Sequence, residues 1–265
     1  MAVYAWADLH GRFDLLLEGL SHLGPEDKVY FLGDAADRGP SGWECIKYIL
    51  ADKRFTYIKG NHEDLLLKAI GSISPTRLPI SDTFYSRDLS LWYRNGGQVT
   101  HLAIITDDTF SNEEKVEMIQ QLKTLPFLKI YHNEKGQHVI LSHSGYDDVD
   151  YGDEEDFIWD RTHWAFYNTW DGKEDEVIVH GHTPIELMIE KQEENAAWAA
   201  YDSEISGCGF DKNKTPKPWD GKSAYWYAKN HKCNIDTGAV WNNTSVLLNL
   251  DTWDEIIIST TPTIS

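Results

Sequence analysis

The chain has 265 residues, with 24 Lys and Arg against 43 Asp and Glu, which gives a formal net charge of −19 at pH 7. This acidity disfavours non-specific binding to nucleic acid or to an anionic membrane surface, because both depend on clustered basic side chains. The three cysteines are scattered and odd in number, so they indicate neither a zinc knuckle nor a disulfide framework. No apolar run approaches the roughly 18 residues of a membrane span. We therefore expect a soluble protein in a reducing, intracellular compartment.

Apolar runs alternate with amphipathic segments over the first 70 residues. Each run is short and bounded by Gly or polar residues, which is typical of a buried strand. Each amphipathic segment places its Leu, Ile and Trp side chains on one face, which is typical of a helix packed on a sheet. This alternation predicts a largely parallel sheet. The expected strands are 4–7, 29–32 and 55–59, and the expected helices are 12–23, 41–50 and 62–70.

The pattern is less regular beyond residue 70. Residues 72–84, with two prolines and several serines, and the acidic run 147–156 are expected to form surface loops. Ser111 and Glu114 have the spacing of a capping box and predict a helix that continues to residue 124. Residues 91–97 end in a Gly pair, which is compatible with the end of a helix. The expected hairpins are 127–141 and 246–259.

Metal-ligating and charged side chains follow the apolar runs where the strands should end. In open α/β sheets, functional groups collect beyond the carboxyl ends of the strands. A carboxylate in that position, with one oxygen facing each way, can bridge two divalent cations. The motifs are Asp8-Leu9-His10-Gly11, Gly33-Asp34 to Asp37-Arg38-Gly39, Gly60-Asn61-His62-Glu63, His143-Ser144-Gly145 and His180-Gly181-His182-Thr183.

This ordered set of five motifs resembles the calcineurin-like metallophosphoesterases, and within them the phosphoprotein phosphatases of the compact bacteriophage and bacterial type. The resemblance covers residues 4–184 and resumes at 235–240, and residues 91–97 also resemble a segment of the phage-type enzymes. It implies an α/β (α+β) fold, a four-layer β-sandwich of two mixed sheets flanked by helices. Ala7, Ala36 and Ser144 depart from the usual pattern, but none of these departures removes a ligand.

The resemblance implies that two divalent metal ions bind at the motifs. One ion would be held by Asp8 and His10, the other by Asn61, His143 and His182, and Asp34 would bridge the two. Manganese is the first expectation for the metal, while iron, Zn²⁺ and Ni²⁺ also accept this ligand set. A hydroxide that bridges the metals would attack the phosphate, and the paired ions would lower its pKa.

The same resemblance assigns catalytic and substrate-binding roles to residues beside these ligands. His62 would be the general acid for the leaving oxygen, and Asp37 would orient it. Arg38 would hold the phosphate with its planar fork, with a second guanidinium from Arg161 in the segment 159–161. Asn61 would contact substrate as well as metal.

We therefore expect a metal-dependent phosphomonoesterase, first of all a serine/threonine protein phosphatase that acts on a phosphorylated protein or a small phosphoester. A dinucleoside-polyphosphate hydrolase of the diadenosine tetraphosphate type is the alternative, and a broad-specificity phosphodiesterase is a further one. A non-enzymatic binding scaffold is disfavoured, because every expected ligand is intact. The expected location is the cytoplasm of a bacterium or of a phage-infected host cell.

We expect residues 1–265 to form one domain with an aromatic-rich insertion at about 190–232. The connection is short in the compact phage-type enzymes, and here it carries many Trp and Tyr residues. Clustered aromatics favour a small satellite core. The alternative is a lid beside the metal site, with Trp219, Tyr225 and Trp226 as wall residues.

Overall fold

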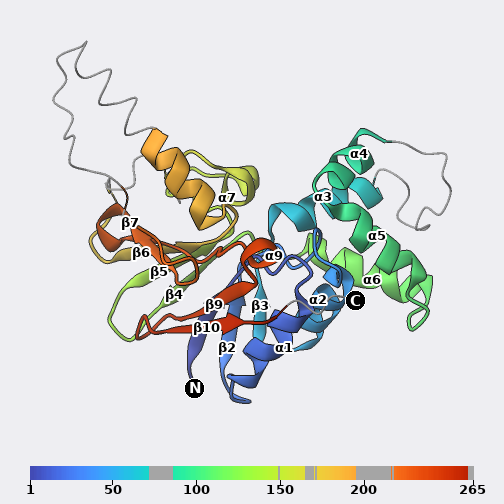
Figure 1. The fold of residues 1–265 in the computed structure, drawn as a ribbon, viewed down its shortest axis with the longest axis horizontal. Coiled ribbons are helices and arrows are strands. Elements are labelled where there is room, and N and C mark those ends of the chain that lie inside the picture. The colour runs from blue at the N-terminus through green and yellow to red at the C-terminus, as the bar shows by residue number, and fades with distance from the viewer. Residues whose placement is uncertain are drawn as a thin grey trace, which may run out of the picture.

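The computed structural model describes residues 1–71, 86–148, 150–164, 170, 172–194, 216 and 218–261. Within these residues the chain forms two five-stranded mixed sheets, with helices outside them (Figure 1). This confirms the expected α/β sandwich. The expected loop at 72–84 and residues 195–215 of the expected insertion lie outside the described residues.

The first sheet, sheet A, has the strand order β10-β9-β1-β2-β3. Its strands are β1 (Val3–Trp6), β2 (Lys28–Phe31), β3 (Phe55–Tyr57), β9 (Thr244–Asn249) and β10 (Glu255–Ser259). The strands β1, β2 and β3 are parallel neighbours, as their alternation with helices predicts. The predicted C-terminal hairpin is β9–β10, which adds antiparallel to β1.

The second sheet, sheet B, has the strand order β4-β5-β6-β8-β7. Its strands are β4 (Leu128–His132), β5 (His138–Ser142), β6 (Glu176–His180), β7 (Tyr225–Tyr227) and β8 (Lys232–Asn234). The expected hairpin β4–β5 is present, and β5, β6 and β8 run parallel. The outermost strand β7 is antiparallel to β8.

Successive residues of β1 serve two different cores, because side chains alternate across a strand. Ala5 belongs to an apolar cluster that also contains Val139 and Val179 of sheet B, so this cluster joins the two sheets. Trp6 instead lies in the cluster formed with the helices that cover sheet A. Both side chains are fully buried. The two sheets thereby bring their strand ends to one common edge.

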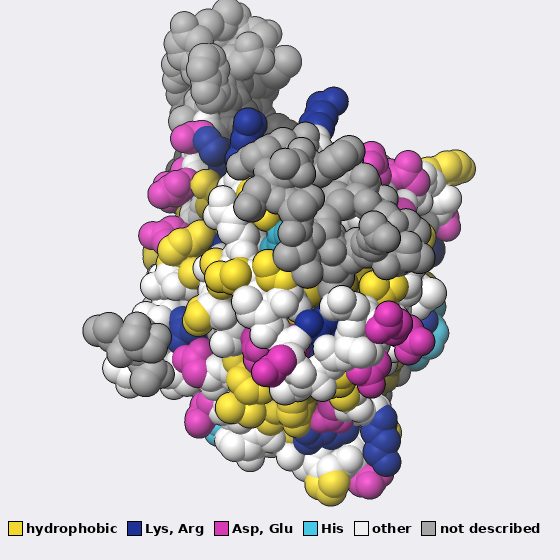
Figure 2. All heavy atoms as spheres, turned by 90° about the vertical axis from the view of Figure 1, so that its right-hand side faces the viewer, with side chains coloured by type: hydrophobic (Ala, Val, Ile, Leu, Met, Phe, Trp, Pro, Cys, Tyr) yellow, Lys and Arg dark blue, Asp and Glu magenta, His cyan; other side chains and the backbone are white. Residues whose placement is uncertain are grey.

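Helices cover the outer side of sheet A. They are α1 (Phe13–Ser21), α2 (Gly42–Ala51), α3 (Asn61–Gly71), α4 (Arg87–Arg94), α5 (Gly97–Thr106) and α6 (Asn112–Lys123), and all six contribute residues to the cluster around Trp6. Figure 2 shows the molecule from the right-hand side of Figure 1. On this face apolar side chains are interspersed with acidic and basic ones. The first three helices and α6 match the predicted segments within about two residues. The helix α5 was not expected from the sequence.

The acidic run 147–156 is not entirely a loop, contrary to the expectation. Its last residues begin α7 (Glu154–Trp159), and the side chain of Asp153 accepts hydrogen bonds from the backbone N–H groups of Glu155 and Asp156. Negative side chains stabilise the first turn of a helix through its dipole. The acidic composition therefore favours a helix start here as much as a solvated loop.

The C-terminal end of the expected insertion belongs to sheet B. Tyr225 and Tyr227 of β7 are buried in a small cluster with Trp164, Ile185 and Met188, and Trp219 packs on it. Trp226 lies on the other face, with its ring edge-on to Trp253 at 5.1 Å. Tyr225 and Trp226 therefore pack in cores and do not form a wall of the metal site. This part of the segment matches the satellite-core alternative.

Among the described residues, no helix has both the length and the apolar character needed to cross a membrane.

Candidate metal centre

The expected ligands come from five loops, each of which follows a strand. β1 leads to Asp8 and His10, β2 to Asp34, β3 to Asn61, β5 to His143 and β6 to His182. Each of these side chains is at most 3% exposed. Because the five strands are parallel within their sheets and the sheets pack face to face, their ends meet at one edge.

The first two loops are held together by backbone hydrogen bonds. The N–H of Asp8 donates to the carbonyl of Gly33, and the N–H of His10 donates to the carbonyl of Asp34 at 2.9 Å. Six site residues have positive φ angles, a conformation that costs non-glycine residues of order 1–3 kcal/mol each. They are Asp8, His10, Asp34, Asp37, Arg38 and His182. Such strain collects at functional sites, where neighbouring contacts enforce it.

A buried carboxylate, Glu63, holds the Asp34 loop against the start of α3. Its oxygens accept hydrogen bonds from the N–H groups of Asp34, Ala35 and Gly60, and from the hydroxyl of Tyr57 at 2.7 Å. The side chain is fully buried. We infer that Glu63 shapes the site without contacting substrate.

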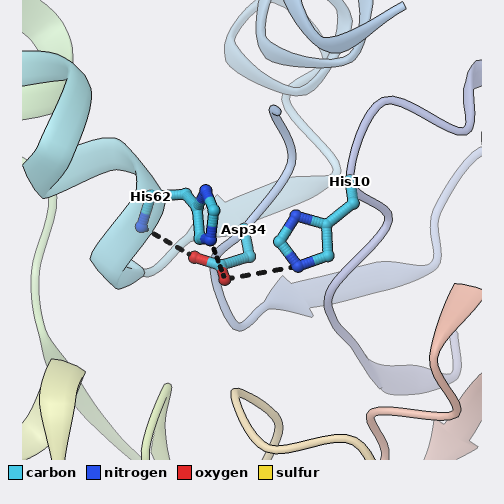
Figure 3. Close-up of side chains that lie close together, drawn as sticks. All are labelled: His10, Asp34 and His62. Atoms are coloured by element: carbon cyan, nitrogen blue, oxygen red, sulfur yellow. Dashed lines mark hydrogen bonds and ion pairs between the residues drawn. The ribbon is translucent and has the colours of Figure 1, made fainter. Parts of the chain in front are cut away.

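Asp34 lies at the centre of the cluster. Its Oδ1 accepts a hydrogen bond from the backbone N–H of His62 at 3.0 Å, while its Oδ2 faces the rings of His10 and His62 (Figure 3). Oδ2 lies 3.6 Å from Nε2 of His10 and 3.8 Å from Nε2 of His62. Oδ1 lies 3.4 Å from Nε2 of His143. The described residues accordingly form two groups of possible ligands that share Asp34, one with His10 and His62 and one with His143 and His182.

Three histidines turn a lone pair toward this cluster. Nδ1 of His10 faces the carbonyl oxygen of Ala36 at 2.9 Å, Nδ1 of His143 faces that of Leu32 at 2.7 Å, and Nε2 of His182 faces that of Trp159 at 3.3 Å. A carbonyl oxygen only accepts hydrogen bonds, so each of these nitrogens carries the proton. In the neutral ring, the second nitrogen is then an electron-pair donor, as a metal ligand must be.

The second nitrogens of His143 and His182 converge on one point with Asn61. Nε2 of His143 and Nδ1 of His182 each lie 2.9 Å from Oδ1 of Asn61, and 3.0 Å from each other. When both rings are neutral, these three electron-pair donors repel one another unless a cation lies between them. Imidazole, carboxamide and carboxylate donors fit Mn²⁺, Fe²⁺, Zn²⁺ or Ni²⁺. The residues present therefore fit a divalent metal.

Burial and neighbouring charges shift the ionisation of the cluster. Burial alone raises the pKa of Asp34, but the surrounding His143, His62 and His10 outweigh it and hold that pKa well below the ordinary value. Burial lowers the pKa of His182 well below its ordinary value, and the charges of His143 and Arg161 lower it further. Burial lowers the pKa of His143, but the charge of Asp34 outweighs it and raises that pKa. Metal ligation requires ionised carboxylates and neutral imidazoles, so metal binding at His143 would release its proton.

Two more carboxylates border the cluster. Both oxygens of Asp8 lie 3.1 Å from the backbone N–H of His182, which donates to them. A Cβ atom on Gly181 would collide with this carboxylate, so the close approach requires glycine. Burial raises the pKa of Asp8 well above its ordinary value, and Asp236 and Asp34 raise it further. Asp236 is itself buried, which raises its pKa to about 6. Asp236 was not among the residues expected from the sequence.

His62 differs from His10, His143 and His182 because its Nδ1 faces a carboxylate. That nitrogen lies 2.7 Å from Oδ2 of Asp37, which also accepts a hydrogen bond from the indole N–H of Trp92 at 2.8 Å. The backbone N–H of Asp37 donates to the hydroxyl of Thr100. The carboxylate fixes the proton at Nδ1 and orients the ring of His62. Trp92 and Thr100 were missed because their distance from Asp37 in sequence hides the contact.

The segment 91–97 supports Arg38. Gly96, the N-cap of α5, has φ = 96°, and its carbonyl accepts a hydrogen bond from the backbone N–H of Arg38 at 3.1 Å. A Cβ atom at Gly96 would lie 2.9 Å from the Cγ and N atoms of Arg38. The Gly pair therefore ends a helix and also makes room for Arg38, so the two interpretations of this segment are compatible.

The two expected phosphate-binding arginines lie on different sides of the donor cluster. The guanidinium of Arg38 contacts Nε2 of His10 and lies 2.9 Å from Nε2 of His62. The guanidinium of Arg161 donates to Oγ1 of Thr183 at 3.1 Å and to the carbonyl of His182 at 3.4 Å. The cluster therefore has a guanidinium beside each of its two groups of donors.

Comparison with known proteins agrees with this geometry. A model of the calcineurin-like phosphoesterase family matches residues 1–214. A symmetrical bis(5′-nucleosyl)-tetraphosphatase of Buchnera aphidicola is 27% identical over 149 residues, which are 55% of this chain and 44% of that protein. Serine/threonine-protein phosphatase 2 of Escherichia coli is 26% identical over 152 residues, 56% of this chain and 61% of that protein. The chain thus spans about half the length of these relatives.

A solved structure shows a similar fold. It is a protein serine/threonine phosphatase from Saccharomyces cerevisiae with similarity to the human phosphatase PP5. It aligns with a TM-score of 0.53 at 13% sequence identity, over 100% of this chain and 82% of that chain. At this identity the likeness concerns the fold alone.

Proposed function

Because the chain belongs to the calcineurin-like phosphoesterase family, we propose that it hydrolyses phosphate monoesters, with phosphoserine and phosphothreonine in proteins as the first substrate class. The observation that carries the proposal is the division of four buried histidines into two kinds. His10, His143 and His182 have a carbonyl behind the ring, whereas His62 has the carboxylate of Asp37. The first kind suits metal ligands and the second a proton donor.

Two divalent ions fit the donors Asp8, His10, Asp34, Asn61, His143 and His182. When bound, such a pair activates water and neutralises the phosphate charge. The division of the two Asp34 oxygens between His10 and His143 supports its role as the bridging ligand. Manganese and a cytoplasmic location stay predictions from the sequence.

The remaining groups have roles that follow from their positions. Arg38 and Arg161 bind phosphate oxygens from the two sides of the cluster, where planar guanidinium groups can each make two hydrogen bonds. Asp37 holds the proton at Nδ1 of His62. Nε2 accepts a hydrogen bond from Arg38 in this structure, and when the ring is also protonated there it can deliver that proton to the leaving oxygen. Trp92 fixes Asp37 by donating to the same carboxylate oxygen.

A second candidate function is the hydrolysis of dinucleoside polyphosphates. It is favoured by the tetraphosphatase of Buchnera aphidicola, which is as similar to this chain as the protein phosphatase of Escherichia coli. The same donors and arginines would then bind an internal phosphate group of the polyphosphate substrate.

The test is a comparison of three substrates under one condition. A phosphoserine peptide, diadenosine tetraphosphate and a cyclic nucleotide are offered to the protein with Mn²⁺, and again after chelation and dialysis. We expect metal-dependent release of phosphate from the peptide with the highest kcat/KM. A higher kcat/KM for diadenosine tetraphosphate would replace the first candidate with the second. Metal-independent turnover, or none, would contradict both.

A further inference from the structure

A large aromatic side chain lies open to solvent beside the metal centre. Trp241 is 60% exposed, although tryptophan is a residue that folding normally buries. It belongs to α9 (Ala239–Asn242), a single helical turn that lies near the centre of Figure 1, close to the ends of sheet A. Folding gains little from an exposed indole, so its position needs another explanation.

The turn that carries Trp241 is firmly anchored. The N–H of Gly238 donates to the buried carboxylate of Asp236 at 2.9 Å, and the side-chain amide of Asn242 donates to the carbonyl of Thr237. Arg12, which is only 7% exposed, donates to the carbonyl of Ala239 at 2.8 Å and to Asn243. The exposed ring is therefore presented by a rigid support that polar groups hold at both ends.

The ring of Trp241 lies next to Arg38. The guanidinium carbon of Arg38 is 5.6 Å from the centroid of the indole, a distance at which a cation is attracted by the aromatic face. The backbone of Arg38 is held by Gly96. Arg38 also contacts His10 and His62, so the indole lies one side chain away from the donor cluster.

We propose that Trp241 forms a binding subsite for a planar aromatic group that the substrate carries next to the phosphate bound by Arg38. The proposal rests on the proposed hydrolysis of phosphate esters in that it places the phosphate at Arg38, and it favours ring-bearing esters over the aliphatic phosphoserine and phosphothreonine. A ring joined to that phosphate by one oxygen, or through a ribose, can reach the open indole. Offset stacking of two aromatic rings then adds binding energy that an aliphatic ester lacks. The two sources of such a ring are an aryl ester and a nucleobase.

The first experiment measures binding without turnover. Isothermal titration calorimetry with Mn²⁺ present compares phenylphosphonate with methylphosphonate, which have the same charged group and differ in the ring. In Trp241→Ala the preference for phenylphosphonate should fall by about tenfold, in line with one lost stacking contact. Trp241→Phe should keep most of the preference. Tyr151→Ala is the matched control, because Tyr151 is an aromatic residue that is 86% exposed in a different loop.

The second experiment identifies the source of the ring. The kcat/KM of adenosine 5′-monophosphate is compared with that of ribose 5-phosphate, which lacks only the base. A base preference that Trp241→Ala removes assigns the subsite to a nucleobase. If Trp241→Ala weakens only the preference for phenylphosphonate and leaves the base preference unchanged, the subsite is assigned to an aryl ester.

The outcomes separate this proposal from the proposed function. A preference for phenylphosphonate that requires Trp241 supports the subsite, even if the protein hydrolyses no ester. The absence of ester hydrolysis would contradict only the proposed function. If esters are hydrolysed but Trp241→Ala changes neither ratio, the subsite is overturned. Equal losses for the ring-bearing and ring-free compounds would also overturn it, because they would show that Trp241 merely positions Arg38.

Discussion

Asp34 is the residue on which the electrostatics of the centre depend most. Its carboxylate belongs to both groups of possible ligands found among the described residues. In Asp34→Asn a neutral amide replaces the charge, so we expect both metal ions to bind at least about 10²-fold more weakly and turnover to be lost. Elemental analysis after dialysis measures the metal content. Two tightly bound ions in the variant would show that Asp34 is not the bridge.

His62 is the residue whose surroundings suit a proton donor. We expect His62→Asn to keep the metal content and to lower kcat by about 10²–10⁴-fold for alkyl phosphates, the usual contribution of a positioned acid. The loss should be smaller for aryl phosphates with good leaving groups, because these need little protonation. Steady-state kinetics with both ester types measure the difference. An equal loss for the two types would argue against an acid role.

At the scale of elements, short polar contacts fix the pieces that carry the site. The loops after β1 and β2 are joined by backbone hydrogen bonds, α4 and α5 hold Asp37 and Arg38, and α1 is tied to α9 through Arg12. Arg12 also forms an ion pair with Asp14 at 2.8 Å. These contacts link elements that are far apart in the chain, so a change in one of them reaches the site indirectly.

The Arg12–Asp14 pair predicts a pH-dependent stability. Partial burial raises the pKa of Asp14, but hydrogen bonds from Arg12 and Thr260 outweigh it and lower the pKa from its ordinary 3.8 to about 2. The ionised carboxylate therefore stabilises the folded state above about pH 4, and this contribution is lost as the pH falls from about 4 to about 2. After allowance for solvent screening, it is on the order of 1 kcal/mol.

Asp14→Asn tests this contribution. At pH 7 its Tm should be about 2–4 °C below that of the unchanged protein, and the two values should approach each other as the pH falls below about 4. Glu18→Gln, in the same helix, is the control and should show no such convergence. A Tm difference that stays constant down to pH 2.5 would contradict the role of the Asp14 charge.

At the scale of the whole molecule, the end of the expected insertion is part of the sandwich. Tyr225, Tyr227 and Lys232 are each at most 4% exposed and lie in β7 and β8. We expect replacement of residues 190–232 by a short Gly-Ser linker to destabilise the protein strongly, because it removes β7 and the start of β8. Thermal unfolding followed by near-UV circular dichroism measures this.

The control for that deletion replaces only residues 195–215 and leaves β7 and β8 in the chain. It should retain cooperative unfolding with a Tm close to that of the unchanged protein. If the longer replacement also unfolds at the unchanged temperature, β7 and β8 are dispensable and residues 190–232 are a separable unit.

The sequence by itself determined the local features of this protein. Strand-end motifs, helix periodicity and hairpin turns depend on residues close together in the chain, so the parallel strands of sheet A, the hairpins and the motifs around Asp34 could be predicted, whereas the sandwich was expected from the family resemblance. The family resemblance supplied the expected roles of those residues. The acidic helix start at Glu154 was misjudged, because the same composition suits a solvated loop and the first turn of a helix.

Only the tertiary structure decided which partners these residues have. The carbonyl of Leu32 faces His143 across 111 residues of sequence, and Trp92 reaches Asp37 across 55. No local pattern encodes such contacts, because they arise from the packing of one sheet or helix on another. The hydrogen-bond partner behind each histidine ring and the exposure of Trp241 beside Arg38 follow from that packing. They support the proposed roles of ligand, acid and subsite among residue types that look alike in the sequence.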